Sequence, residues 1–321
     1  MNGAGRGTET TQEAIERLLR RALWGGAILL LLATAGFAGF YYQDRYLYRN
    51  DPLVERQIRH MEAVIRENPA DVDARVTVAE WYLRNGMLEE ALTQGQEALK
   101  LDPNHTDAHI LLARVYLQMG NTDQAIAHFA RVARMSEDNE FAVIDRRMNV
   151  VYYNLGELYR QQGDYQRAID ALRGALRVDR TDADARYALG LTYQALGDHQ
   201  AATREFNEAL RFVPDFTEVY VGLKESYTAL GLETEAAYAE AMIDYGQEDY
   251  AAAMEKLERI AQEGDDFAPI YLGLALTYEK LGAIEAAIDA IHRYLETNPE
   301  SVIARHTLGR LTAQLSRTGG R

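Results

Sequence analysis

The chain contains no cysteine. This absence excludes disulfide bonds, cysteine-ligated zinc, thiol catalysis and the lipid-bearing cysteine of a lipoprotein. It does not indicate a compartment, because a chain without cysteine fits either side of a bacterial membrane. At 321 residues with 47% hydrophobic content, the chain nevertheless has ample apolar surface to bury.

Patterns that carry catalysis or phosphate binding are also missing. The sequence has no glycine-rich phosphate loop and no nucleophile motif. Seven histidines are scattered along it; His105 and His109 are four residues apart, but His105 falls in an expected turn, which argues against a metal site there. We therefore expect a protein that is not an enzyme and that has no catalytic residues, bound metal or cofactor.

Basic side chains are scarce compared with acidic ones. The chain has 34 Lys and Arg against 49 Asp and Glu, which gives a net charge of −15. Because no basic stripe is present to neutralise phosphates, nucleic acid is not an expected partner. Residues 218–266 hold thirteen acids and three bases, either as an ordinary solvated surface or as a docking site for a basic partner. The candidate residues for such an acidic patch are Glu233, Glu235, Glu240, Asp244, Glu248 and Asp249.

A long hydrophobic run lies near the N-terminus. Residues 22–42 carry no charge. At about 1.5 Å of rise per residue, a helix of this length spans ~30 Å, which is the thickness of the bilayer hydrocarbon. Trp24 lies near one end, and Tyr41 and Tyr42 lie at the other, as interfacial aromatic residues do. We expect a transmembrane helix at residues 22–42, preceded by a short cytoplasmic-type tail at residues 1–21.

Two alternatives concern whether this run is cleaved and how it is oriented in the membrane. Ala33-Thr-Ala35 has the small-x-small form of a signal-peptide cleavage site, but the apolar run continues past it, which favours an uncleaved anchor. Three arginines directly precede the run, whereas four arginines follow it within residues 45–59. The three arginines directly before the run are nearer to it than the four that follow. They favour a single-pass protein of the cell (inner) membrane, with a cytoplasmic N-terminus and the rest of the chain outside.

The rest of the chain repeats a small set of residues at a regular spacing. A tyrosine recurs at intervals of 34 residues, with one interval of 43 and one of 51. A small residue lies three positions before it in all but one case, a glycine always four positions after it, and an alanine always nine positions after it. A repeat of this length indicates a stack of helical hairpins, none of which can bury its apolar face alone. The six tyrosines are Tyr82, Tyr116, Tyr159, Tyr193, Tyr227 and Tyr278.

Each repeated residue has a physical role in such a hairpin. The small residue lets two helices approach closely, and the tyrosine fills the adjacent groove. The glycine ends the first helix because it enters the left-handed region without a Cβ penalty, and the alanine leaves room where the second helix crosses the first. Residues 153–159 and 163–168 closely resemble the consensus of the tetratricopeptide repeat (TPR) family. The resemblance covers about residues 52–316 and implies an all-α fold, a right-handed α-solenoid of TPR hairpins preceded by one transmembrane helix.

The repeat register divides the chain into successive units. Each 34-residue unit is expected to supply two helices, and a helix without a following partner is expected to cap each end of the stack. The expected units are a linker and capping helix at 43–71, four hairpin units at 72–216, an irregular acidic segment at 217–267, a last unit with its capping helix at 268–316 and a frayed tail at 317–321.

Two segments depart from the regular repeat. Residues 140–148 are extra residues without glycine or proline, and their apolar spacing predicts a first helix lengthened by about 2.5 turns, as a strut or a docking arm. Residues 217–267 hold one and a half repeats, with helices expected near 217–230, 233–245 and 250–263. Because an odd helix inverts the up–down order, we expect a kink or a boundary between two sub-solenoids there.

In families that the chain resembles, the concave surface made by the first helices often binds the partner. The resemblance implies such a face here, and its apolar and aromatic character favours a hydrophobic segment or an amphipathic helix as the ligand. The Lys/Asn/Arg clamp with which some family members hold a C-terminal carboxylate is absent at the matching positions. The expected protein-binding residues are Ile110, Leu111, Arg114, Tyr153, Asn154, Glu157, Tyr187, Leu191 and Gln194.

These expectations combine into a hypothesis for function. The chain is expected to be a membrane-anchored scaffold that recruits or assembles other membrane or envelope proteins, because the anchor raises the effective concentration of local partners. The alternative is a permanent accessory structural subunit of a larger membrane protein complex, with its groove always filled.

Overall fold

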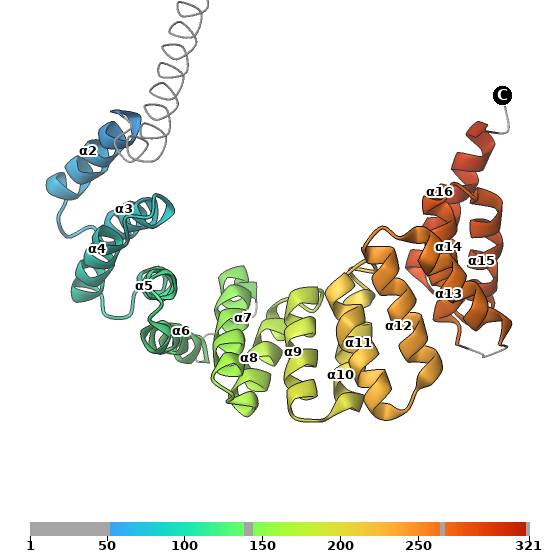
Figure 1. Ribbon diagram of the computed structural model, residues 1–321. Helices are drawn as coiled ribbons and strands as arrows, with labels where there is room; N and C mark the ends of the chain where they lie inside the picture. Colours follow the sequence, from blue (N-terminus) through green and yellow to red (C-terminus); the bar gives the residue numbers. More distant parts are fainter. Residues whose placement is uncertain (1–51, 138–143, 264–266, 319–321) are drawn as a thin grey trace, which may run out of the picture.

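The regular elements of the computed structural model are α-helices throughout the residues it describes, which are 52–137, 144–263 and 267–318 (Figure 1). They are α2 (Pro52–Glu67), α3 (Val72–Arg84), α4 (Leu88–Leu101), α5 (Thr106–Gln118), α6 (Thr122–Glu137), α7 (Arg146–Gln161), α8 (Tyr165–Val178), α9 (Ala183–Ala195), α10 (His199–Leu210), α11 (Thr217–Leu230), α12 (Glu233–Gly246), α13 (Tyr250–Gln262), α14 (Pro269–Lys280), α15 (Ile284–Thr297) and α16 (Val302–Thr318).

Consecutive helices pack as hairpins, and the hairpins stack side by side into a curved array with α2 at one end and α16 at the other (Figure 1). We call α3, α5, α7, α9 and α11 first helices, and α4, α6, α8 and α10 second helices. The first helices α7, α9 and α11 contact one another in turn, as α3 contacts α5, whereas neighbouring second helices do not pack to that extent within the described ranges. The first helices therefore lie on the inner, shorter side of the curve. The expected all-α repeat fold is confirmed.

The turn inside each hairpin is built on the repeated glycine. All six of these glycines have φ between 71° and 78°, the left-handed region that a side chain disfavours. In the third repeat the backbone N–H of Asp164 then reaches back to the carbonyl of Tyr159 at 2.9 Å, and the Asp164 side chain caps α8. The predicted role of the glycine as the end of the first helix is confirmed.

The repeated tyrosine links each hairpin to the one before it. In five of the six repeats its hydroxyl hydrogen bonds a side chain 20 residues earlier, on the preceding helix of the stack. In the remaining repeat the Arg167 guanidinium lies 4.5 Å from the centre of the Tyr159 ring. The tyrosines therefore add polar contacts to the packing that their spacing predicts. The five pairs are Tyr82–Glu62, Tyr116–Gln96, Tyr193–Arg173, Tyr227–Asn207 and Tyr278–Glu258.

Close approach between repeats is clearest around Phe206 on α10. Its ring is fully buried between Gly190 of α9 and Gly222 of α11. A Cβ built on Gly190 would lie 2.4 Å from the ring, and one on Gly222 would lie 2.6 Å from it. Glycine at these two positions therefore lets one second-helix aromatic side chain fill the space between two first helices.

The extra residues between the second and third repeats lengthen the first helix less than the sequence predicts. Helix α7 begins at Arg146, because the Asp145 side chain accepts a hydrogen bond from the backbone N–H of Arg147 and caps the helix. Of the extension expected over residues 140–148, only the last three residues are helical in the described part of the chain. Residues 140–143 lie outside that part.

The irregular segment contains one helix that serves two hairpins. The three helices expected near 217–230, 233–245 and 250–263 are α11, α12 and α13. Helix α12 packs on α11 as the second helix of that hairpin. It also packs on α13, and it contacts α14 as one first helix contacts the next. Helix α12 is therefore the second helix of the repeat that contains Tyr227 and also the first helix of the repeat that follows. The repeat register of the stack changes at this helix.

When α12 is taken as a first helix, two unusual residues stand at the repeat positions of the glycine and the tyrosine. Glu248 occupies the glycine position, where it has φ 65°, and the N–H of Asp249 reaches back 3.0 Å to the carbonyl of Asp244. Asp244 therefore stands where other repeats have the tyrosine, and its carboxylate lies 2.7 Å from the Lys256 ammonium. The alanine nine residues after Asp244 is Ala253, which is fully buried. The alanine nine residues after Tyr227 is Ala236, which is only partly buried.

None of the described helices is both long and apolar enough to cross a bilayer. The transmembrane helix expected at residues 22–42, and the tail before it, lie outside the described residues.

Candidate functional site

The candidate site is the exposed stripe along the first helices α7, α9 and α11, which we call the inner wall. The repeat register sets its members, because they lie nine, six and two residues before each repeated tyrosine and one residue after it. Their side chains are half-buried or exposed. The inner wall consists of Val150, Tyr153, Glu157, Arg160, Asp184, Tyr187, Leu191, Gln194, Glu218, Val221, Glu225 and Thr228.

Apolar and aromatic side chains form the middle of the inner wall. The Tyr187 ring lies 5.2 Å from that of Phe216 and 5.9 Å from that of Phe206 between ring centres, and the side chain is half-buried. Val150 and Val221 are 48% and 52% exposed. Burial raises the pKa of both wall tyrosines, and neighbouring carboxylates raise it further. The wall therefore offers half-desolvated rings and uncovered aliphatic side chains to a partner.

Some polar members of the inner wall are already engaged with the chain itself. Glu157 and Arg160 form an ion pair at 2.8 Å. The Gln194 amide donates to the carbonyl of Gly222 at 3.3 Å and to the Ser226 hydroxyl at 3.2 Å. These contacts tie α9 to α11 and fix the orientation of the wall.

The structure separates the predicted binding residues into three groups. Tyr153, Glu157, Tyr187, Leu191 and Gln194 lie together on the inner wall. Asn154 lies beside it and donates to the Val150 carbonyl at 2.7 Å within its own helix.

The remaining predicted residues belong to α5. Leu111 is 1% exposed and packs in the core, so its expected place on the binding face is wrong: it points toward α4. Ile110 and Arg114 do occupy the exposed stripe of α5, but the extra residues separate this helix from α7, and Arg114 pairs with Glu80 at 3.3 Å.

The register also identifies wall residues that the sequence-based selection missed. Val221 and Glu218 stand six and nine residues before Tyr227, the positions that Tyr187 and Asp184 hold before Tyr193. Applying the same count to every repeat would have found them.

The candidate acidic patch is not a single uncompensated surface. Glu240 lies 3.0 Å from the Lys224 ammonium and 2.9 Å from that of Lys256, and their hydrogen bonds lower the pKa of Glu240 to about 2. Asp244 shares Lys256. The others lie toward the two ends of α12: Glu233 and Glu235 in its first turn, and Glu248 and Asp249 in the turn that follows it.

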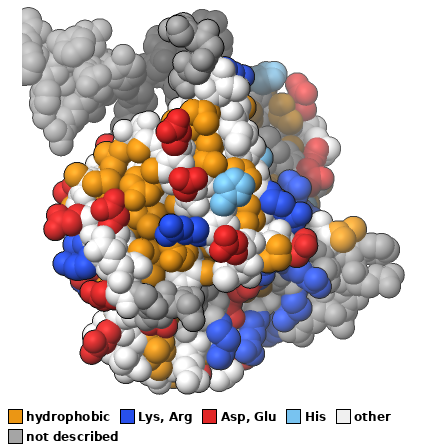
Figure 2. All heavy atoms as spheres, turned by 90° about the vertical axis from the view of Figure 1, so that its right-hand side faces the viewer, with side chains coloured by type: hydrophobic (Ala, Val, Ile, Leu, Met, Phe, Trp, Pro, Cys, Tyr) orange, Lys and Arg blue, Asp and Glu red, His pale blue; other side chains and the backbone are white. Residues whose placement is uncertain are grey.

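The acidic excess is not visible at the C-terminal end of the stack either. Figure 2 views this end and shows hydrophobic side chains interspersed with acidic and basic ones. This face therefore presents no uniform charge.

Three of the seven histidines make structural contacts. His105 caps α5 and lies 3.0 Å from Asp73. The Nε2–H of His109 donates to the Pro103 carbonyl at 3.1 Å, so its Nδ1 accepts from the Nδ1–H of His128 at 2.8 Å. Burial lowers the pKa of both rings, to about 4 for His128, which keeps the pair neutral. No group of three metal-ligating side chains occurs within the described ranges.

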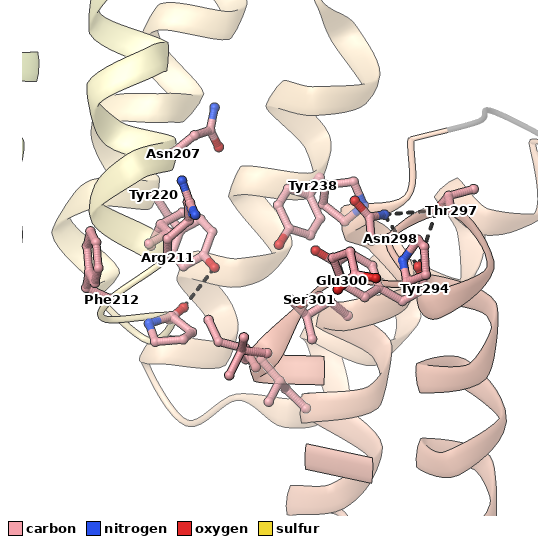
Figure 3. A pocket seen from close by; sticks show the side chains of 18 residues that line it. Asn207, Arg211, Phe212, Tyr220, Tyr238, Tyr294, Thr297, Asn298, Glu300 and Ser301 are labelled. Atoms are coloured by element: carbon pink, nitrogen blue, oxygen red, sulfur yellow. Dashed lines mark hydrogen bonds between the residues drawn. The ribbon is translucent and has the colours of Figure 1, made fainter. Parts of the chain in front are cut away.

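A cavity of about 750 Å³ lies where the register changes (Figure 3). Its lining comes from α10, α11 and the turn between them, from α12 and α14, and from α15, α16 and the turn between them. The Tyr220 hydroxyl donates to the Pro214 carbonyl at 2.9 Å, and the Tyr238 ring lies between the two sides. The cavity is a mixed surface of aromatic rings, aliphatic groups and amides.

Comparison with known proteins agrees with the repeat register. Family profiles described as TPR repeat or tetratricopeptide repeat match residues 72–115, 95–142, 156–197, 183–215 and 244–314. No curated protein matches the chain.

Several solved structures are similar to this chain. YrrB, described as a TPR protein with an unusual peptide-binding site, is 20% identical, with 61% of this chain and 96% of that chain covered and a TM-score of 0.52. MamA is 27% identical over 57% of this chain and 96% of that chain, with a TM-score of 0.45. A tetratricopeptide repeat protein from Parabacteroides merdae is 18% identical over 84% of this chain and 97% of that chain, with a TM-score of 0.46. The profile matches and the repeated hairpins identify the chain as a tetratricopeptide repeat protein.

Proposed function

We propose that this repeat protein is a membrane-anchored scaffold that holds a segment of another protein along its inner wall and thereby recruits or assembles membrane or envelope proteins. The observation that carries the proposal is the uncovered apolar stripe of Tyr153, Tyr187, Leu191 and Val221 on three contiguous first helices. Its curvature and length suit an extended or helical segment better than a small molecule.

The rigidity of the inner wall supports the same proposal. Phe206 and the Gln194 hydrogen bonds hold α9 and α11 in fixed register, so the wall needs little reordering when a partner binds. A preformed surface loses less conformational entropy on association than a mobile one. The wall is therefore suited to binding a partner segment in the conformation that the structure shows.

Anchoring is the second part of the proposal. The uncharged run at residues 22–42 is long enough to span a bilayer, and only about ten residues separate it from α2. A tether this short confines the inner wall near the inner membrane, on the outer side if the arginines before the run stay in the cytoplasm. Confinement raises the effective concentration of membrane partners without any new contact.

The test is a pull-down with the full chain from a mild detergent extract. Tyr153→Ala combined with Tyr187→Ala is expected to abolish partner capture, because the substitutions remove both wall rings, while the helical circular dichroism signal changes little. Val221→Gln, which replaces an exposed side chain, is expected to weaken capture without touching the core.

A matched control removes the same groups away from the wall. Tyr165 and Tyr250 begin the helices α8 and α13 just after their capping aspartates, so Tyr165→Ala with Tyr250→Ala should leave capture unchanged. Undiminished capture by the folded wall variants would dismiss the inner wall as the binding site.

A further inference from the structure

We infer that the partner segment is cationic, with lysine or arginine side chains alternating with apolar ones, and that the inner wall selects it by charge as well as by shape. The inference rests on the proposed function, because it names the chemistry of the segment that the same wall holds. Four side-chain properties of α7, α9 and α11 carry it: charge, pairing, position and spacing.

The first step is the charge on the inner wall. Its charged members are four acids and one base, and the base, Arg160, is paired with Glu157. The other three acids, Asp184, Glu218 and Glu225, are exposed, and no ion pair involves them within the described residues. The wall therefore carries three carboxylates that form no ion pair with any residue the structure describes.

The contrast with α12 makes this distribution informative. Glu240 and Asp244 of α12 share Lys224 and Lys256, so the chain compensates these acids itself. On the inner wall the chain supplies no lysine. Acids in the first turn of a helix interact favourably with the helix dipole, which accounts for Asp184 and Glu218. Glu225 lies in the middle of α11 and has no such role.

The third step is the position of the carboxylates relative to the rings. Asp184 and Glu218 stand nine residues before the repeated tyrosines of α9 and α11, and these two helices pack on α7 and α9, which carry Tyr153 and Tyr187. In keeping with this placement, Asp184 contributes to the raised pKa of Tyr153, and Glu218 contributes to that of Tyr187. An acid and a half-buried aromatic ring on adjacent helices suit a lysine or arginine side chain, whose stem can pack on the ring while its charge meets the acid.

The spacing of these acid and ring pairs predicts the spacing of the cations. Adjacent helices lie about 8–10 Å apart, so successive cation sites on α9 and α11 repeat at roughly that distance. An extended segment covers this distance in about three residues, and a helix covers it in about six. We therefore expect basic residues at one of these two intervals.

The test uses two fluorescein-labelled peptides and the full chain in nonionic detergent. One peptide repeats Arg-Leu-Ala five times, and the other has glutamate in place of each arginine. Fluorescence anisotropy is expected to show at least about tenfold tighter binding of the arginine peptide, a preference that decreases as salt is added.

Charge reversal on the wall makes the test specific. Asp184→Lys with Glu218→Lys should weaken the arginine peptide at least about tenfold and strengthen the glutamate peptide. The control, Glu233→Lys with Glu235→Lys, makes the same change in net charge at the start of α12 and should leave both affinities unchanged.

Three results would overturn the cationic assignment: equal binding of the two peptides by the wild-type chain, binding of neither, or an equal effect of the control variant. Equal binding that Tyr153→Ala with Tyr187→Ala abolishes would leave the inner wall as a binding site and remove only its charge preference. The proposed function itself fails separately, if capture of the natural partner is insensitive to those tyrosines.

Discussion

Replacing Phe206 by alanine is expected to lower the free energy of unfolding by about 3–5 kcal/mol. The ring is fully buried and contacts both Gly190 and Gly222, so its removal leaves a cavity between α9, α10 and α11. Neither glycine has a side chain that could move into the space. The cost should therefore lie toward the upper end of the range for an aromatic truncation.

Chemical unfolding of the full chain, followed by circular dichroism, measures this effect. Phe212→Ala is the matched control, because Phe212 is 41% exposed and its truncation should cost far less. Phe206→Leu, which keeps most of the apolar volume, should fall between the two. Equal costs for Phe206→Ala and Phe212→Ala would show that the packing between the two glycines does not stabilise the repeats.

Replacing Tyr238 by alanine is expected to separate the unfolding of the two parts of the stack and to cost about 3–5 kcal/mol. Tyr238 lies on α12, the helix that serves two hairpins, and its ring meets Tyr220 at 6.1 Å and Phe267 at 5.3 Å between ring centres. In a solenoid each unit is stabilised mainly by its neighbours, so a weakened shared helix uncouples the units on either side.

Two probes distinguish uncoupling from general destabilisation. In a Trp24→Phe background, Trp81 on α3 reports the N-terminal repeats alone, while circular dichroism reports all helices. With Tyr238→Ala, the circular dichroism transition should acquire an earlier phase, and the Trp81 transition should keep its midpoint. Coincident shifts of both signals would contradict the special role of α12.

The regular parts of this fold follow from local sequence signals. Each repeated glycine adopts the left-handed conformation that its position after the tyrosine predicts, and the helices of the irregular segment begin and end close to the predicted residues. These signals are local, because a turn or a cap depends on a few neighbouring residues. The stack of hairpins then follows from the period alone.

The irregular features could be predicted only in part. The odd number of helices in residues 217–267 predicts a boundary there. The sequence does not show that the boundary lies at α12, because a glutamate takes the place of the glycine in the following turn and Asp244 takes the place of the tyrosine. The cap at Asp145 is a short-range signal that the helical spacing of the apolar residues on both sides of it obscured.

The inner wall was only partly predictable for a related reason. Periodicity places a residue on the exposed stripe of a helix, but it does not say which charges find a partner. The pairing of Glu240 with Lys224 and Lys256, and of Glu157 with Arg160, requires the packed helices. For Leu111, a shift of one position along α5 decides between the core and the exposed stripe.

Site-specific photo-crosslinking in intact cells tests the binding of a partner on the inner wall most directly. A photoreactive amino acid in place of Val221 lies on the wall, whereas one in place of Arg204 lies on an exposed surface of the second helix α10. The account predicts a crosslinked partner band for position 221 that Tyr153→Ala with Tyr187→Ala removes, and no such band for position 204. Crosslinks of equal strength at both positions, or at position 204 alone, would contradict it.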